Sequence, residues 1–206
     1  MNLPLAPQSG RGKYDRAHSP AERAATQARR LIDATARVVA QHGLSGTTID
    51  RVVRAAGVGR NTFYRHYRDL PHAVRHARAT ASASLWKEAS SGLAAAYTPT
   101  EKIRAILRVW LRLARTDPDT VALLLVPSHR ENGTLATEAT AALGQLLTAT
   151  LADAHRDAVL STPPDPLRVL AATGALEAVT RSYLKDPASL DAAHATLVDV
   201  VTRLFR

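Results

Sequence analysis

The sequence contains no cysteine among its 206 residues. A disulfide framework, a cysteine-ligated zinc finger and a thiol nucleophile are therefore excluded. No uninterrupted apolar run approaches the ~20 residues needed to span a membrane. The first residues, MNLPLAPQSGRGKYDRAHS, lack the apolar core of a signal peptide. We therefore expect a soluble cytoplasmic protein without a membrane partner.

Sequence signatures of catalysis are also missing. No Ser-His-Asp set, carboxylate pair or Gly-rich phosphate loop stands out. His72 and His76 are one helical turn apart and could chelate a metal, but the sequence offers no evident third ligand. We predict that the protein is not an enzyme and that it has no cofactor and no metal.

Positive charge is concentrated in the first part of the chain. The formal net charge is +9, and residues 1–80 hold 14 Lys or Arg against 5 Asp or Glu. Residues 81–206 hold 13 of each kind. All the excess positive charge therefore lies in the N-terminal part, which predicts a nucleic-acid-binding unit joined to a unit with another task.

Several helix starts can be recognised from the sequence. Ser19-Pro20-Ala21-Glu22 and Thr98-Pro99-Thr100-Glu101 each combine a capping residue, a first-turn proline and a capping-box glutamate. Asp117-Pro118, Asp165-Pro166 and Asp186-Pro187 repeat the pattern of an acid before proline.

Apolar residues between these starts recur with a period of 3.6, and no segment alternates convincingly as a strand. We predict an all-α protein of about nine helices, over residues 20–42, 48–55, 60–67, 71–91, 99–115, 118–126, 134–160, 166–185 and 188–204. Residues 1–18, rich in proline, glycine and basic groups, are predicted to be a disordered tail.

The stretch TTIDRVVRAAGVGRNTFYRHYR, residues 47–68, predicts two short helices around a turn. Thr47 can cap the first helix, with Asp50 as the acid of a capping box. Gly57 supplies a left-handed turn, and Val58 and Phe63 can pack between the helices. This is the layout of a helix-turn-helix, whose second helix enters the DNA major groove.

The second helix carries side chains suited to reading bases. Arg60 has the forked geometry to bind guanine O6 and N7, and Asn61 can bind adenine N6 and N7. Arg65 and Arg68 can add contacts to the DNA backbone, although an exposed arginine is often simply solvated. Tyr67 is expected in the core rather than on the DNA.

The N-terminal third resembles the tetracycline-repressor (TetR) family of bacterial transcriptional regulators. The resemblance covers about residues 28–75 and is carried by Ala28 to Ala34, Ala36, His42-Gly43, Thr47-Thr48, Ala56-Gly57-Val58 and Thr62 to Tyr67. It implies a DNA-binding domain over residues 19–70 and a helical ligand-binding and dimerisation domain over residues 71–206. By the same resemblance, Thr62 and Tyr64 contact phosphate or a thymine methyl and His66 contacts phosphate. Thr47 and Thr48 complete the predicted DNA-binding set.

Two positions depart from the family pattern. Gly59 stands where a capping Ser or Thr is common, and glycine is a weaker but acceptable cap. Leu70 stands where the family commonly has a phosphate-binding lysine, so we expect one phosphate contact to be missing. The basic tail of Arg11, Lys13 and Arg16 can compensate by following the minor groove, or it can be inert.

The C-terminal part yields three further expectations. A ligand pocket lined by Trp86, Tyr97, Trp110 and Leu123 is one interpretation, and ordinary core is the other. Arg104, Arg108, Arg112 and Arg115 form a basic stripe, which is either solvated or binds an anionic effector. The segments within residues 166–205 resemble the family's dimerisation helices, although their apolar stripes can instead belong to an intramolecular core.

Together these features predict a dimeric repressor released from a palindromic operator in double-stranded DNA by a small-molecule effector. The alternative is a ligand-independent structural or nucleoid-associated DNA-binding protein of the same fold. An enclosed apolar cavity would distinguish the two.

Overall fold

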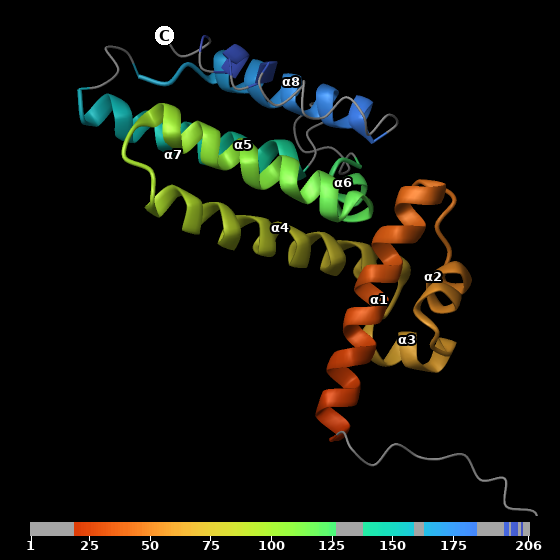
Figure 1. Ribbon diagram of the computed structural model, residues 1–206. Helices are drawn as coiled ribbons and strands as arrows, with labels where there is room; N and C mark the ends of the chain where they lie inside the picture. The colour runs from red at the N-terminus through yellow and green to blue at the C-terminus, as the bar shows by residue number, and fades with distance from the viewer. Residues whose placement is uncertain are drawn as a thin grey trace, which may run out of the picture.

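The computed structural model describes residues 19–126, 138–158 and 163–184, together with positions 196, 197, 199–201 and 203. Every regular element in this part of the chain is an α-helix, which confirms the all-α prediction (Figure 1). The helices are α1 (Pro20–His42), α2 (Ile49–Ala56), α3 (Arg60–His66), α4 (Leu70–Ala94), α5 (Pro99–Thr116), α6 (Pro118–Leu124), α7 (Glu138–Arg156) and α8 (Pro166–Tyr183). The predicted tail over residues 1–18 and most of the predicted helix over 188–204 lie outside the described residues.

The helices gather into two groups (Figure 1). Helices α1, α2 and α3 pack together, and α4 leads from them to α5, α7 and α8, which run roughly alongside one another. Helix α6 lies where the groups meet and contacts both α1 and α4. No helix among the described residues is long and apolar enough to cross a membrane.

Both predicted capping boxes are present. The Ser19 N–H donates to Glu22 Oε2 over 2.6 Å and the Glu22 N–H donates to Ser19 Oγ over 3.2 Å. Thr98 and Glu101 repeat the exchange at the start of α5, over 2.9 and 3.2 Å. Backbone N–H donors at residues 19 and 98 lower the pKa values of the two glutamates, because they stabilise the charged carboxylate. Local sequence thus defines where these helices begin.

The prediction that Thr47 caps α2 is wrong by one residue. Thr48 is the cap, and its Oγ1 accepts from the Arg51 N–H over 3.3 Å. Thr47 is buried, and its hydroxyl donates to the Gly43 carbonyl over 2.6 Å. That bond commits Thr47 to the preceding turn, so Asp50 falls one position short of the capping-box site. Gly57 has the predicted left-handed conformation, with φ +64°.

Helix α1 is buried on two sides. Leu31, Ala34 and Val38 pack against α2, α3 and the start of α4, in a cluster that also contains the fully buried Phe63. Another side, with Ala36 and Val39, packs against α4 and against Leu123 of α6. The largest cluster joins α4, α5, α6, α7 and α8. Helix α1 is therefore the element shared between the helix-turn-helix and the helices that follow it.

Leu70, the first residue of α4, lies where two of these clusters meet. It is half-buried and packs against both the α1–α2–α3 cluster and the cluster that contains Val74 and Leu123. The packing of Leu70 therefore supports a structural role for this residue, and not the loss of a phosphate contact that the sequence suggested. An apolar side chain here joins α4 to the helix-turn-helix.

We expect Leu70→Lys to destabilise the protein by about 1–3 kcal/mol, because an ammonium group enters an apolar contact. Thermal melting should show a loss of several degrees, whereas Leu70→Met, which keeps the volume, should cost less than about 1.5 kcal/mol. An unchanged melting temperature, with a salt dependence of DNA binding steeper by about 1.8 per dimer, would restore the phosphate-contact interpretation.

Candidate nucleic-acid interface and adjoining pocket

Helix α3 is held by aromatic side chains on its inner side. Phe63 is completely buried and Tyr67 is 4% exposed, and their ring centroids lie 5.5 Å apart. This anchoring turns the polar residues outward: Arg60, Asn61, Tyr64 and Arg65 are all exposed. Gly59 precedes the helix as an N-cap without a side-chain hydrogen bond, as the sequence predicts. The helix therefore presents a basic, hydrogen-bonding surface that starts at its N-terminal end.

Arg60, the first residue of α3, is paired with Asp50 of α2. Arg60 Nε lies 2.8 Å from Asp50 Oδ1, and Nη2 donates to Asp50 Oδ2 over 3.3 Å. This side-on contact uses the Nε edge of the guanidinium and leaves the edge formed by Nη1 and Nη2. The remaining edge has the two parallel donors that match guanine O6 and N7. Asp50 therefore holds Arg60 in an orientation compatible with base reading.

Arg65 and Arg68 also have intramolecular partners. Arg65 Nη2 donates to Thr62 Oγ1 over 3.0 Å and to Gln27 Oε1 of α1 over 3.5 Å, which links α3 to α1. Arg68 Nε lies 3.2 Å from Asp69 Oδ2. All of these side chains remain accessible, so such contacts restrict the arginines at little energetic cost.

Eight of the nine residues predicted to contact DNA lie at or near the surface: Thr48, Arg60, Asn61, Thr62, Tyr64, Arg65, His66 and Arg68 are exposed or half-buried. Thr47 is the exception, because its buried hydroxyl bonds to the backbone of Gly43. Sequence reasoning missed Asp50 as a member of this surface. Its contact with Arg60 spans ten positions, and opposite charges on neighbouring helices were the only signal for it.

The histidine pair noted in the sequence surrounds Tyr67. The Tyr67 hydroxyl and His76 Nδ1 are 2.9 Å apart, and the Arg68 N–H donates to His72 Nδ1 over 3.4 Å. Burial raises the pKa of Tyr67 above its ordinary value. No group of three potential metal ligands occurs within the described part of the chain. His72 and His76 thus hydrogen-bond to Arg68 and Tyr67, the residues that directly follow α3.

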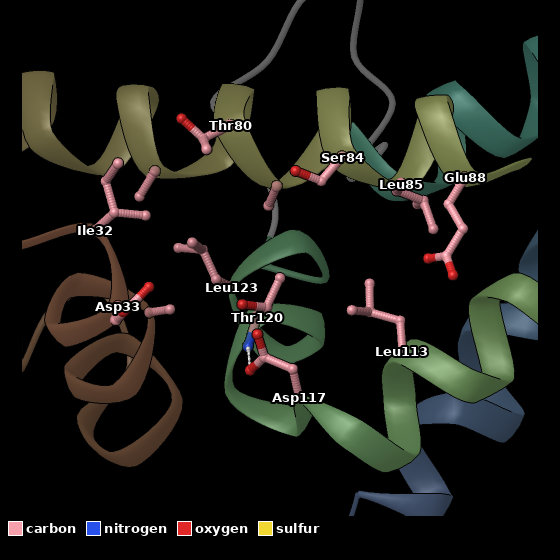
Figure 2. A pocket seen from close by; sticks show the side chains of 13 residues that line it. Ile32, Asp33, Thr80, Ser84, Leu85, Glu88, Leu113, Asp117, Thr120 and Leu123 are labelled. Atoms are coloured by element: carbon pink, nitrogen blue, oxygen red, sulfur yellow. Dashed lines mark hydrogen bonds between the residues drawn. The ribbon is translucent and has the colours of Figure 1, made fainter. Parts of the chain in front are cut away.

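A pocket of about 190 Å³ lies where α1, α4, α5 and α6 meet (Figure 2). Its polar lining consists of three carboxylates and three hydroxyls, from Asp33, Glu88, Asp117, Thr80, Ser84 and Thr120. Apolar side chains such as Ile32, Leu113 and Leu123 complete the walls. In Figure 2, Glu88 extends from α4 and Leu113 from α5 toward the space between them, with Thr120 and Leu123 on α6. The pocket is therefore shared between α1 and the later helices.

Only Leu123 of the four predicted pocket residues lines this space. Trp110 is 1% exposed and belongs to the core, where its Nε1 donates to Thr180 Oγ1 of α8 over 2.8 Å. Trp86 is 46% exposed and Tyr97 is 93% exposed, so these two rings lie at the surface. Periodicity identified large apolar residues but not which side of each helix faces the cavity. The four arginines of the α5 stripe are all exposed, and Arg112 pairs with Glu88.

Helix α8 carries an exposed apolar face. Leu167 is 73% exposed and Leu170 is 53% exposed, and the small residues Ala171, Gly174 and Ala178 are exposed on the same helix. Val200, in the following segment, is 39% exposed. Large apolar side chains in such exposed positions are typical of a protein contact surface.

Comparisons with known proteins agree with this architecture. Residues 31–69 match the family model for bacterial regulatory proteins of the tetR family. The fatty acid degradation regulator FadR from Bacillus halodurans superposes with a TM-score of 0.71 at 18% identity, over 91% of this chain and 96% of that one. FadR from Bacillus subtilis, solved with stearoyl-CoA, gives 0.72 at 14% identity, over 84% and 96%. A gamma-butyrolactone receptor gives 0.59 at 18% identity, over 89% and 97%.

No curated protein sequence matches this one. The structural likeness, at these low identities, shows the fold: a helix-turn-helix unit followed by a helical bundle, as in transcriptional regulators. The match over residues 31–69 covers the helix-turn-helix itself. Over residues 31–69, which include α2 and α3, the chain is therefore similar to bacterial regulatory proteins of the tetR family.

Proposed function

We propose that this protein is a dimeric transcriptional repressor that leaves a palindromic operator when a small molecule binds. The observation that carries the proposal is the surface of α3, where Arg60 and Asn61 stand exposed at the N-terminal end of a tetR-type recognition helix. Residues near this end contact base edges in helix-turn-helix proteins. The protein would act in the cytoplasm, on double-stranded DNA.

Base reading and backbone binding are assigned to different residues. Arg60 binds guanine and Asn61 binds adenine in each half-site. Thr48, Arg65, His66 and Arg68 would position the helix through contacts to the DNA backbone, which carry little sequence information. Thr62 and Tyr64 would contact phosphate or a thymine methyl. Asp50 is a positioning residue, because it acts through Arg60.

Two-fold symmetry follows from the small size of the recognition helix. Helix α3 has seven residues and reads only a few base pairs, so a second copy is needed to define a unique site. We place the dimer interface within residues 166–205, because α8 exposes Leu167 and Leu170 beside small residues that permit close helix approach. A two-fold interface would bury the same face of both subunits.

Ligand control is proposed for the helices that follow the helix-turn-helix. We divide the chain into a DNA-binding domain, residues 19–70, and a ligand-binding and dimerisation domain, residues 71–206. Two structural neighbours are a FadR solved with stearoyl-CoA and a gamma-butyrolactone receptor, so the fold accommodates small molecules. A ligand would favour a spacing of the two recognition helices that no longer matches the half-sites.

The alternative is a ligand-independent structural DNA-binding protein of the same fold. The pocket between α1, α4, α5 and α6, here called the junction pocket, is lined by three carboxylates and three hydroxyls, so it is not the enclosed apolar cavity that would distinguish the two functions. A ligand in this pocket would contact both α1 and α6, and the contact between these two helices would transmit its effect.

Replacement of Arg60 should separate specificity from affinity. Arg60→Ala is expected to cost about 1–3 kcal/mol on the preferred site and to relax base preference at one position of each half-site. Arg68→Ala should weaken binding to all sequences alike and flatten the salt dependence by about 0.9 per subunit. Fluorescence anisotropy with operator and scrambled duplexes measures both effects. Unchanged base preference in Arg60→Ala would show that α3 is oriented differently on DNA.

Asp50→Asn tests the positioning role. Loss of the ion pair frees Arg60 to bind phosphates, so affinity for scrambled DNA should rise while the ratio of specific to non-specific affinity falls. The same change in an Arg60→Ala background should no longer alter that ratio. Asp153→Asn, an exposed acid of α7, is the matched control for the loss of one negative charge. An equal change of the ratio in both backgrounds would refute the role of Asp50.

The interface is tested by Leu167→Lys combined with Leu170→Lys. Because both side chains are exposed, the subunit should keep its helical content, yet sediment as a monomer at micromolar concentration and lose operator binding. Tyr97→Lys, which replaces a still more exposed aromatic side chain outside α8, should remain dimeric. A wild-type monomer that binds operator DNA specifically would contradict the two-fold assignment.

A further inference from the structure

All the charged side chains that line the junction pocket are acidic. Asp33 of α1, Glu88 of α4 and Asp117 at the start of α6 approach it from three elements, and no lysine, arginine or histidine lines it. None of the ion pairs in the described part of the chain involves Asp33. Asp117 caps α6 through the Thr120 N–H over 3.1 Å, and Glu88 pairs with Arg112 of α5. Of the three carboxylates, exposed Asp33 is therefore the one with neither an ion pair nor a capping bond among the described residues.

The uncharged lining residues indicate what kind of molecule the pocket could hold besides a charged group. Ile32, Leu85, Leu113 and Leu123 supply apolar surface, and Thr80, Ser84 and Thr120 supply hydroxyls. A bare metal ion does not suit this mixture, and no group of three potential metal ligands lies together among the described residues. The volume of about 190 Å³ compares with the roughly 150 Å³ engineered cavity that accommodates benzene. The space therefore suits a molecule of about the size of one ring.

We propose that this pocket binds a small organic cation, an alkyl- or arylamine whose ammonium group faces Asp33 and whose apolar body contacts the leucine side chains. The ammonium group would pair with the Asp33 carboxylate and could donate to hydroxyls of the lining, and such partners offset the loss of water around a charged group. Arg104, Arg108, Arg112 and Arg115, which the sequence suggests as an anion site, are not lining residues of this pocket, although Arg112 pairs with the lining residue Glu88.

A bound amine would contact α1 directly, because Ile32 and Asp33 of this helix line the pocket. Arg37 of α1 lies 3.9 Å from Asp119 of α6 beside the apolar contact of Ala36 and Val39 with Leu123, so the pocket adjoins the main junction of the two helix groups. An amine that binds one spacing of α1 and α6 more tightly shifts the population toward that spacing. Because α1 also packs against α3, DNA affinity should change with it, a consequence that rests on the proposed function.

The test uses benzylamine, which carries an ammonium group, and benzyl alcohol, its neutral counterpart of similar shape. Titration calorimetry and NMR of backbone amides should show benzylamine binding with shifts at α1, α4 and α6, and benzyl alcohol binding at least tenfold more weakly. Asp33→Asn should reduce benzylamine affinity about tenfold. Asp153→Asn, which removes an acid of α7 that is not part of the lining, should leave it unchanged. Asp33 is exposed on α1, so its replacement is compatible with folding, and thermal melting provides the check.

Each outcome bears on a different part of the proposal. Equal binding of the alcohol and the amine, no binding of benzylamine, or full affinity in Asp33→Asn would overturn the cation site. Anisotropy of labelled operator DNA, with and without benzylamine, tests the coupling separately. Asp33-dependent binding without any change in DNA affinity would retain the site and reject its regulatory consequence. A change in DNA affinity that persists in Asp33→Asn would place the amine elsewhere.

Discussion

The two-sided burial of α1 is the constraint on which the rest of the structure depends. Leu31 and Val38 fix the helix against α2 and α3, while Ala36 and Val39 fix it against α4 and α6. A close-packed helix with two apolar interfaces cannot shift against one neighbour without disturbing the other. A rearrangement of α4 and α6 would therefore reach α3, even though α6 is distant from α3 in sequence.

The surface of α3 that we propose faces DNA combines this rigid support with weakly held charges. Phe63 and Tyr67 anchor α3 from inside, whereas Arg60, Arg65 and Arg68 have exposed partners that each contribute little to stability. Such partners instead restrict side-chain orientation before DNA arrives, which lowers the entropy lost on binding. In the proposed function, the excess positive charge of residues 1–80 would supply the general attraction to DNA, and the orientation of Arg60 would supply selectivity.

Local signals in the sequence predicted the helix starts and the helix-turn-helix, because capping residues, prolines and Gly57 act within a few positions of one another. The start of α2 was displaced by one residue, since the bond from Thr47 to Gly43 competes with capping. The roles of Leu70, Asp50 and Trp110 depend on contacts between separate helices, which periodicity does not encode. The junction pocket escaped prediction for the same reason, because its lining comes from four helices.

Selection of bound fragments from a random DNA library is the most direct measurement of the central claim, that two copies of α3 read a two-fold site. The account predicts an enriched inverted repeat whose half-sites lie about one helical turn, or a multiple of it, apart, with a guanine in each half at the position bound by Arg60. Enrichment of a single asymmetric site, or recovery of fragments without any common sequence, would contradict it.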